Sequence, residues 1–346
     1  MFELAGKLHD PIDLSLGMPD MELPADIKEQ AIFQLNDKPG YSVTAGYFDV
    51  RKAVAEKLKR KNQIDATPEE IIITSGATGG LSLALFSILN REDEVVVIDP
   101  YFVLYNQMID FIGAKAVKVS SYPDFCLPID RIKTAITSRT KVILINTPNN
   151  PTGAVYHLTE LKALAELAKI HNIIIVSDEV YEPFVYHNNK HVSVASLYAN
   201  TVTIMGPSKS DGLAGWRIGY LHAPAEIVEQ MIKVQQVFYV CAPTPAQKAL
   251  LLSLRHDYQT LVDKFEKKRD AVFSTLSKKY PISSLQGSFY AFFEVGNDKE
   301  YVEKLVGKSV LLVPGSVFST KLTHVRLAYG VNDNLLQKGL DIIMSV

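Results

Sequence analysis

The sequence contains little cysteine and has almost no net charge. Among its 346 residues are only two cysteines, Cys126 and Cys241, which lie far apart and outside any Cys-x-x-Cys spacing. This pattern argues against a disulfide framework and against a thiolate metal site. Lysine and arginine number 36 and aspartate and glutamate 38, a formal charge of -2, so nothing favours nucleic acid or an anionic membrane as a partner. The expected partners are small molecules or a second copy of the chain.

Long apolar runs and targeting segments are also missing. Asp or Lys interrupts each apolar run well before membrane-spanning length, and residues 1–17 lack the basic start and apolar core of a secretion signal. With 47% hydrophobic and 21% charged residues, the chain has the composition of a globular protein of about two domains. We expect it to work in the reducing cytoplasm.

Short runs rich in valine and isoleucine dominate the middle of the chain. They alternate with helical patterns and lack polar alternation, which is typical of strands buried on both faces of a parallel sheet. We therefore predict a large α/β domain over residues 41–240. A smaller α+β domain is predicted from 1–40 with 241–346, because an amphipathic stretch at 246–279 precedes antiparallel-looking strands and a last helix. The runs of the large domain are EVVVID (94–99), KVILIN (141–146), IIIVSDE (173–179), TVTIMG (201–206) and RIGYLHAP (217–224).

A glycine-rich turn follows the strand-like run at residues 71–74. The sequence SGATGG (75–80) separates that run from a helical pattern, and the free N–H groups at a helix start suit any phosphate. A dinucleotide fingerprint requires Gly-x-Gly-x-x-Gly, whereas the spacing here is Gly-x-x-Gly-Gly, although Asp99 ends the next strand about twenty residues later. The turn alone leaves three interpretations open: a dinucleotide site, a site for another phosphate compound, or a structural turn.

Further polar clusters follow other strands of the predicted sheet. TPNNPTG (147–153), SDEVYEPF (177–184) and GPSKSDGLAGWRIGY (206–220) each stand at or just beyond a strand end. Ligands of open α/β sheets bind at the carboxyl edge of the strands. A lone loop lysine is ordinarily solvated, but Lys209 belongs to one of several clusters expected at the same edge. The sequence therefore predicts a ligand site there.

The order of three motifs carries a family resemblance. Asn-Asn-Pro-Thr-Gly, Ser-Asp-Glu-Val-Tyr and Ser-Lys-x-x-Gly-x-x-Gly-x-Arg resemble the motifs of class I/II aminotransferases, which are fold-type I enzymes dependent on pyridoxal 5'-phosphate. The resemblance covers essentially the whole chain, from residues 14–24 to 324–330. It implies a fold like that of aspartate aminotransferase, with a mostly parallel seven-stranded sheet between helices and a smaller α+β domain. It also implies a homodimer whose active sites are shared between subunits.

The resemblance assigns the contacts with the cofactor ring. Lys209 matches the lysine that holds the cofactor as a Schiff base and then carries protons as general acid and base. Asp178 matches the carboxylate that keeps the ring nitrogen protonated, while Asn150 and Tyr181 resemble the pair that hydrogen-bonds the 3'-oxygen. Phe102 matches the aromatic side chain that stacks on the ring. Taken singly, such residues would more often be turn caps, turn formers or core.

The glycine-rich turn resembles the phosphate cup of the family. The N–H groups of Ala77 and Thr78 match those that hold the phosphate ester, and the Thr78 hydroxyl is expected to add to them. Arg217 matches the arginine that clamps the same phosphate through two hydrogen bonds. Tyr41 resembles the tyrosine that reaches a phosphate oxygen from the other subunit. The resemblance thus favours a phosphate-bearing ligand over the other two interpretations of the turn.

Substrate binding is assigned in the same way. Arg326, in HVRLAYG (324–330), matches the arginine that binds the α-carboxylate, although an isolated strand arginine would ordinarily form a surface salt bridge. Gly17 matches the glycine whose segment closes over the substrate, and Asn150 joins the expected substrate contacts. The chain departs from many relatives at Gly206, where they carry a serine that donates to the phosphate. No second cation is assignable to a side-chain carboxylate of the substrate.

Two histidines have a spacing that would suit a metal. His187 and His191 stand in HNNKH, an asparagine-rich connection without a nearby acidic residue in the sequence. A solvated loop is the ordinary meaning of such a segment. We therefore predict that both histidines lie in a solvated loop and that the protein holds no metal.

The predicted function is a cytoplasmic transaminase of amino-acid metabolism or biosynthesis. It would move an amino group between an L-amino acid and a 2-oxo acid by ping-pong kinetics. A lyase on the same scaffold, either a C–S β-lyase or an enzyme like aminocyclopropane-carboxylate synthase, would share all the residues above. A sensing module of a transcription regulator is disfavoured because no DNA-binding segment precedes residue 41. A nicotinamide dehydrogenase would leave Lys209, Asp178 and Arg326 unexplained.

Overall fold

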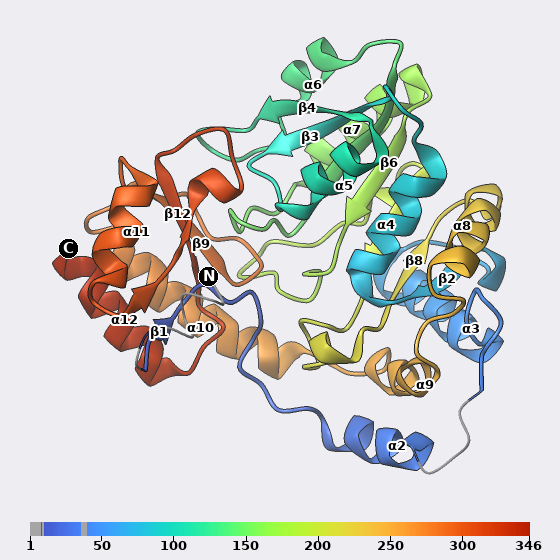
Figure 1. Ribbon diagram of the computed structural model, residues 1–346, viewed down its shortest axis with the longest axis horizontal. Helices are drawn as coiled ribbons and strands as arrows, with labels where there is room; N and C mark the ends of the chain where they lie inside the picture. Colours follow the sequence, from blue (N-terminus) through green and yellow to red (C-terminus); the bar gives the residue numbers. More distant parts are fainter. Residues whose placement is uncertain (1–7, 9, 36–39) are drawn as a thin grey trace.

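The computed structural model describes all residues except 1–7, 9 and 36–39. The excepted residues belong to the predicted small domain, and that part of the prediction lies outside the described residues. Figure 1 shows a large unit around one sheet and a smaller unit. The smaller unit contains β9 (Tyr290–Glu294), β12 (His324–Ala328), α10 (Gln259–Leu276), α11 (Asp298–Val306) and α12 (Asp333–Ser345). No helix in the described part of the chain is both long and apolar enough to span a membrane.

The large unit is built on a seven-stranded sheet in the order β2-β8-β7-β6-β5-β3-β4. All neighbouring strands pair in parallel except β8, which runs antiparallel to both β2 and β7. The predicted α/β class with a mostly parallel sheet is confirmed. The strands are β2 (Ile71–Thr74), β3 (Glu94–Asp99), β4 (Lys115–Ser120), β5 (Thr140–Asn146), β6 (Ile174–Asp178), β7 (Thr201–Met205) and β8 (Gly219–His222).

Helices cover both faces of this sheet, which explains its valine and isoleucine content. Val95 and Val97 of β3 pack under α4 (Gly76–Ile88), α5 (Leu104–Ile112) and α8 (Ala225–Phe238). Val96 and Ile98 point to the opposite face, because successive side chains of a strand alternate. There they pack against α6 (Ile129–Ala135) and α7 (Leu158–His171). Both sets are buried, so the strands need no polar alternation.

The sequence-based prediction missed strand β4 and the interruption between two consecutive helices. β4 lies at the edge of the sheet and is only partly buried, so its sequence KAVKVS alternates and lacks a continuous apolar run. The amphipathic stretch predicted at 246–279 is two helices, α9 (Thr244–Ser253) and α10 (Gln259–Leu276). The intervening residues contain no glycine or proline, so the sequence offers no ordinary signal for the break.

The smaller unit contains a three-stranded antiparallel sheet in the order β11-β12-β9. Its aromatic and aliphatic side chains form one buried cluster with α10 and with two further helices. A separate parallel pair joins β1 to β10, so the start of the described chain is fixed to this unit. The additional elements are β1 (Ile12–Asp13), β9 (Tyr290–Glu294), α11 (Asp298–Val306), β10 (Val310–Leu311), β11 (Val313–Pro314), β12 (His324–Ala328) and α12 (Asp333–Ser345).

The packing of α9 bears on the predicted domain boundary at residue 240. α9 shares a hydrophobic cluster with α2 (Ala25–Leu35), α3 (Phe48–Lys57) and strand β2 of the large unit. We therefore propose a domain boundary beyond α9, whereas the sequence-based prediction placed it at residue 240. The N-terminal segment is divided as well, because β1 pairs in the smaller unit while α2 packs on α9.

Candidate active site

A cavity of about 510 Å³ opens at the carboxyl ends of the parallel strands. Strand β6 ends at Asp178, and the chain beyond β7 leads to Lys209. Strand β12 of the smaller unit brings Arg326 to the opposite wall. The structure thus brings together every predicted site residue except Tyr41, namely Gly17, Ala77, Thr78, Phe102, Asn150, Asp178, Tyr181, Lys209, Arg217 and Arg326.

Lys209 is a mostly buried amine in this cavity. Its Nζ donates a hydrogen bond to the backbone oxygen of Gly17 at 2.6 Å. Burial lowers the pKa of Lys209 to about 8, and the positive charges of Arg326 and Arg217 act in the same direction. Roughly a tenth of the amine is therefore neutral at pH 7, far more than for a lysine of ordinary pKa, and the neutral form is the one that a nucleophile or proton acceptor requires.

Asp178 is a buried carboxylate, 8% exposed, at the end of β6. Its Oδ2 accepts a hydrogen bond from the hydroxyl of Tyr105 at 2.8 Å, and its Oδ1 accepts one from the N–H of Val180 at 3.3 Å. Burial raises the pKa of Asp178 above its ordinary value, while the bond from Tyr105 opposes the rise. A positive charge placed in the cavity against this carboxylate would be strongly favoured, because it would relieve the cost of burying the anion.

Three polar side chains form a chain of contacts across the cavity. The hydroxyls of Tyr181 and Tyr290 lie 2.9 Å apart, and Nδ2 of Asn150 approaches the Tyr181 hydroxyl at 3.5 Å. Burial raises the pKa of Tyr181 well above its ordinary value, so this phenol stays protonated and can donate. The predicted pair of Asn150 and Tyr181 therefore does meet in space.

Arg326 is a buried guanidinium in the cavity lining, held by polar and aromatic contacts. Its Nη1 donates to Oδ1 of Asn150 at 3.0 Å, and its Nη2 donates to the backbone oxygen of Ser15 at 2.6 Å. The guanidinium lies between the rings of Tyr290 and Phe318, at 4.6 and 4.7 Å from their centres. Its Nε is buried and has no hydrogen-bond partner in the part of the chain that is described. A buried, partly unsatisfied guanidinium is suited to bind a carboxylate.

The start of α4 and Arg217 together form an anion site. Ala77 and Thr78 lie in the first turn of α4, where backbone N–H groups lack intrahelical partners. Gly76 precedes them with a φ of +73°, and a Cβ there would lie 2.5 Å from Nη2 of Arg217. Glycine thus allows both the left-handed turn and the close approach of the guanidinium. The site combines N–H groups, a helix start and a fixed positive charge, which suits a phosphate group.

Gly206, the departure noted in the sequence, has a packing reason. A Cβ at this position would lie 3.1 Å from the Cα of Gly219 and 3.3 Å from the backbone oxygen of Ile218. Both neighbours are backbone atoms of the adjoining strand region, so they cannot rotate away as a side chain can. The close approach of two backbone segments favours glycine here, and Ser208 is the hydroxyl residue of this loop that lines the cavity.

We predicted that His187 and His191 lack acidic partners, and this prediction is wrong because each contacts a carboxylate. Nε2 of His191 lies 2.8 Å from Oε2 of Glu179, and its side chain is only 10% exposed. Burial lowers the pKa of His191, but the carboxylates of Glu179 and Glu182 together hold the pKa above its ordinary value. His187 is more exposed and lies 2.6 Å from Glu266. Tertiary packing supplies acidic partners that the local sequence does not show. Among the described residues no group of three or more metal-ligating side chains occurs.

The family model for aminotransferase class I and II matches residues 9–343. The chain belongs to this family. A probable aspartate aminotransferase of Methanocaldococcus jannaschii is 34% identical, with 100% of this chain and 95% of that protein covered. Aromatic-amino-acid aminotransferase 2 of Thermococcus litoralis is 35% identical, with 99% and 92% covered. The solved structure of aspartate aminotransferase from Thermus thermophilus with maleate has a TM-score of 0.95 at 34% identity, with 99% of this chain and 94% of that chain covered.

The enzyme class and the cofactor follow from this membership. The aminotransferase uses pyridoxal phosphate to move an amino group between an amino acid and a 2-oxo acid, as the motifs predicted. The cavity fits that cofactor on chemical grounds. It offers an anion site at α4 and Arg217, a buried carboxylate at Asp178 and an amine at Lys209. These three features match the phosphate, the ring nitrogen and the aldehyde of pyridoxal phosphate.

Two tyrosines of the aminotransferase site are absent from the sequence-based prediction. Tyr105 lies on α5 and holds Asp178, and Tyr290 lies on β9 beside Arg326. Neither belongs to a polar cluster at a strand end. The signal for Tyr290 is its strand pairing. β9 runs antiparallel to β12 with Phe292 opposite Arg326 and Tyr290 opposite Ala328, so Tyr290 lies diagonal to Arg326 on the same face of the sheet. That pairing is visible only in the folded chain.

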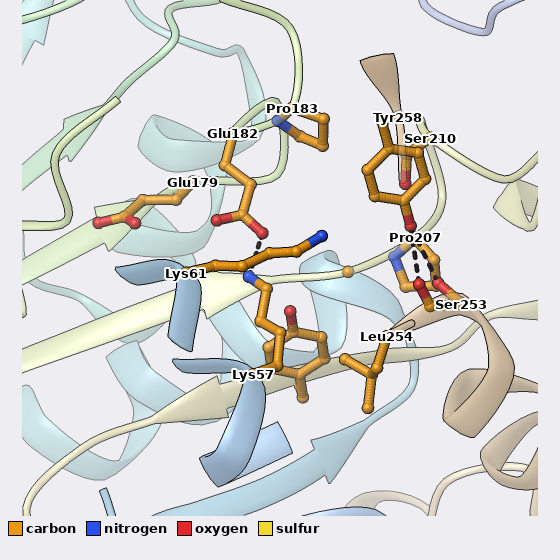
Figure 2. A pocket seen from close by; sticks show the side chains of 12 residues that line it. Lys57, Lys61, Glu179, Glu182, Pro183, Pro207, Ser210, Ser253, Leu254 and Tyr258 are labelled. Carbon is orange, nitrogen blue, oxygen red and sulfur yellow. Dashed lines mark hydrogen bonds and ion pairs between the residues drawn. The ribbon is translucent and has the colours of Figure 1, made fainter. Parts of the chain in front are cut away.

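A second, smaller polar pocket lies beside the loops that carry the site residues of the aminotransferase. Figure 2 shows the ammonium of Lys57 meeting Glu182 on one side of this pocket and the hydroxyl of Tyr258 meeting Ser253 on the other. Oε2 of Glu182 also accepts a hydrogen bond from Asn62 at 2.7 Å. Glu182 follows Tyr181 directly, so this ion pair fixes the segment that carries a site residue.

We expect Glu182→Gln to lower the free energy of unfolding by about 3 kcal/mol, because it leaves the buried ammonium of Lys57 without its counter-charge. Urea denaturation of the cofactor-free protein measures the change. The double variant Lys57→Met/Glu182→Gln removes that charge as well and should recover most of the loss. A single variant as stable as the native protein would show that the pair does not stabilise the fold.

Proposed function

We propose that this aminotransferase carries out both half-reactions in the cavity described above, with Lys209 as the group that moves the proton. Pyridoxal phosphate, when bound, supplies an aldehyde that takes up the amino group and a ring that withdraws electrons from the substrate's Cα. The observation that carries the proposal is the convergence of Lys209, Asp178 and Arg326 on one cavity. An amine, an anion and a carboxylate-binding cation are the three groups that this chemistry requires of a protein.

The substrate is held and deprotonated by residues from opposite walls. Arg326 binds the α-carboxylate through its guanidinium, and Asn150, which already contacts Nη1 of Arg326, adds an amide to the same group. Nζ of Lys209 takes the proton from Cα of the substrate and delivers it to the carbon of the cofactor's aldehyde group, C4'. The lowered pKa of Lys209, about 8, keeps this amine able to accept a proton near neutral pH.

The cofactor is oriented by the remaining residues. Asp178 would stabilise the positive charge on a protonated ring nitrogen, and the hydroxyl of Tyr181 would donate a hydrogen bond to the ring's 3'-oxygen. Ala77, Thr78 and Arg217 would hold the phosphate at the start of α4. The ring of Phe102 would stack on the cofactor ring and exclude water from it.

The names of the relatives suggest the candidate substrates. These proteins are named for aspartate or for aromatic amino acids, and the Thermus structure contains maleate.

The experiment that tests the proposed function is to add single L-amino acids, without any 2-oxo acid, to the holoenzyme and follow its visible absorbance. We expect the band of the loaded cofactor to give way to that of its aminated form. A persistent band with release of ammonia or pyruvate would instead indicate a lyase.

We also propose the homodimer with shared sites that the family resemblance implies. Tyr41 is 84% exposed and does not line the cavity of its own chain, as expected of a side chain that serves the other subunit. Phe111 and Val237 are 82% and 81% exposed, and the ring of Phe86 links Phe111 to Phe238 at centroid distances of 6.0 and 5.3 Å. Exposed apolar side chains of this kind favour contact with another protein. Sedimentation equilibrium is expected to show a dimer, and a monomer at micromolar concentration would contradict the proposal.

We propose a cytoplasmic location for the enzyme. Both cysteines, Cys126 and Cys241, are free, which suits a reducing compartment. Cell fractionation with detection of the protein tests this, and recovery outside the cytoplasmic fraction would contradict it.

A further inference from the structure

The loop that carries Lys209 contains a buried carboxylate that has no part in the proposed function. Asp211 stands two residues after Lys209, at a position that the motif Ser-Lys-x-x-Gly-x-x-Gly-x-Arg leaves open. Its Oδ2 accepts hydrogen bonds from the hydroxyls of Ser210, Ser253 and Tyr258 at 3.0, 2.7 and 2.7 Å. A buried anion remains costly, even when hydrogen-bonded, unless a positive charge lies beside it.

This positive charge comes from His256, whose ring lies between two carboxylates. Its Nδ1 lies 2.7 Å from Oδ1 of Asp211, and its Nε2 lies 3.0 Å from Oδ2 of Asp26 on α2. A neutral imidazole has one N–H and can donate to only one of them, whereas the imidazolium donates to both. Burial lowers the pKa of His256, but the hydrogen bonds to Asp26 and Asp211 outweigh burial and hold the pKa above its ordinary value.

The groups that face His256 from other directions leave the imidazolium in place. The ring of Tyr258 packs edge-on against the imidazole at 6.3 Å. Two cations approach from the helical segment Leu58–Asn62. Nζ of Lys61 donates to the backbone oxygen of His256 at 3.1 Å, and Nη2 of Arg60 donates to a nearby backbone oxygen at 3.2 Å. Both cations are thus bound by backbone oxygens, while the ring nitrogens face carboxylates.

The two carboxylates belong to segments that also meet at the active site. Asp211 follows Lys209, and Asp26 follows Gly17, whose backbone oxygen accepts the hydrogen bond from Nζ of Lys209. The segments touch between these points as well, because a Cβ on the glycine after Asp211 would lie 3.6 Å from the backbone oxygen of Met21. The Lys209 loop and residues 17–26 therefore run side by side from the cavity to His256.

We propose that Asp211 and His256 are positioning residues, which hold the Lys209 loop and residues 17–26 together through an ionic link to Asp26. The inference deepens the proposed function and rests on it, because it takes Lys209 as the reactive amine and Gly17 as part of the substrate site. Without the link, residues 17–26 would separate from the loop for part of the time. The apparent affinity for the amino acid would fall accordingly, while the limiting rate would be kept.

The link depends on the charge of His256 and therefore on pH. It is fully present below the ordinary pKa of histidine and is lost as the pH rises through the raised pKa of His256. Deprotonation breaks the contact with Asp26 rather than that with Asp211, because the side chain of Asp26 is 51% exposed and water can replace the donor. High pH thus releases residues 17–26 and leaves the Asp211 contact intact.

Hydrogen–deuterium exchange of the holoenzyme measures the link without any turnover. His256→Asn keeps an N–H donor near the place of Nδ1, toward Asp211, and removes the donor toward Asp26. At pH 6 we expect the amides of residues 17–26 to exchange at least about threefold faster in this variant than in the native enzyme, and at pH 9 about equally fast. Equal exchange at pH 6, or a ratio that does not change with pH, would overturn the inference.

A matched pair of variants on α2 serves as the control. Asp26→Asn and Glu29→Gln each remove one negative charge from an exposed residue of this helix. At pH 6 we expect Asp26→Asn to speed exchange as much as His256→Asn does, the double variant to add nothing further, and Glu29→Gln to exchange like the native enzyme. Additive effects in the double variant would show that the two residues act separately, contrary to the proposed link.

Stopped-flow absorbance of the half-reaction separates this inference from the proposed function. At pH 6 we expect His256→Asn to raise the amino-acid concentration that gives half the limiting rate by at least about threefold, with the limiting rate changed by less than about twofold. A lower limiting rate with an unchanged half-saturating concentration would contradict the positioning role. If no amino acid changes the absorbance of the native holoenzyme, the proposed function fails, and the exchange ratios still decide whether the link exists.

Discussion

Replacing Lys209 with alanine is expected to lower the rate of amino-group transfer by at least about ten-thousandfold. Under the proposed function, the variant loses the Nζ amine that would hold the cofactor and also move the proton between carbons. The phosphate site at α4 and Arg217 is untouched, so the variant should still bind pyridoxal phosphate, though without a covalent link. Stopped-flow absorbance of the half-reaction measures the rate, and equilibrium dialysis measures the cofactor.

Two further variants make the Lys209 result specific. Lys209→Arg keeps a positive charge but removes an amine able to accept a proton, so it should be as slow as the alanine variant. Lys190→Ala removes an exposed lysine and should leave the rate unchanged. If Lys209→Ala retained a rate within about tenfold of the native enzyme, another group would have to move the proton.

The second large effect is expected at Asp178. Asp178→Asn preserves the shape of the side chain but removes the negative charge that, under the proposed function, would face the ring nitrogen. The ring would then lose its proton and much of its ability to withdraw electrons. We expect the rate of the half-reaction to fall by at least about a thousandfold, while near-ultraviolet circular dichroism stays native. The same stopped-flow measurement serves as the readout.

Tyr105→Phe is the control for Asp178. It removes the hydrogen bond from the Tyr105 hydroxyl, 2.8 Å from Oδ2, but leaves the carboxylate in place. The expected loss is about tenfold. A similar loss in both variants would mean that hydrogen bonding rather than charge accounts for the role of Asp178.

The sequence predicts the interior strands well because a strand that is buried on both faces has a continuous apolar sequence. β3 and β5 are continuous apolar runs, and their predicted and observed bounds agree within one residue. The edge strand β4 lacks a continuous apolar sequence, since part of its surface is exposed to solvent. The break between α9 and α10 is likewise unmarked, because it is produced by packing against different units rather than by glycine or proline.

The site residues divide in the same way, into those that the sequence marks and those that it does not. Lys209, Asp178 and Arg326 stand in motifs, so the family resemblance assigns them to one site from the sequence alone. Tyr105 and Tyr290 enter through a helix face and a strand register, which a single sequence does not reveal. Phe318 and Val313 are ordinary apolar residues in sequence, and they meet Arg326 only in the folded chain.

The measurement that tests the account most directly is peptide mapping after borohydride reduction of the holoenzyme. Borohydride fixes the cofactor covalently to the lysine that holds it, and mass spectrometry then identifies the labelled peptide. The account predicts one labelled peptide, which contains Lys209, and no label in Lys209→Ala. Label on another lysine, or a native enzyme that turns over without any reducible link to a lysine, would contradict the central role given to Lys209.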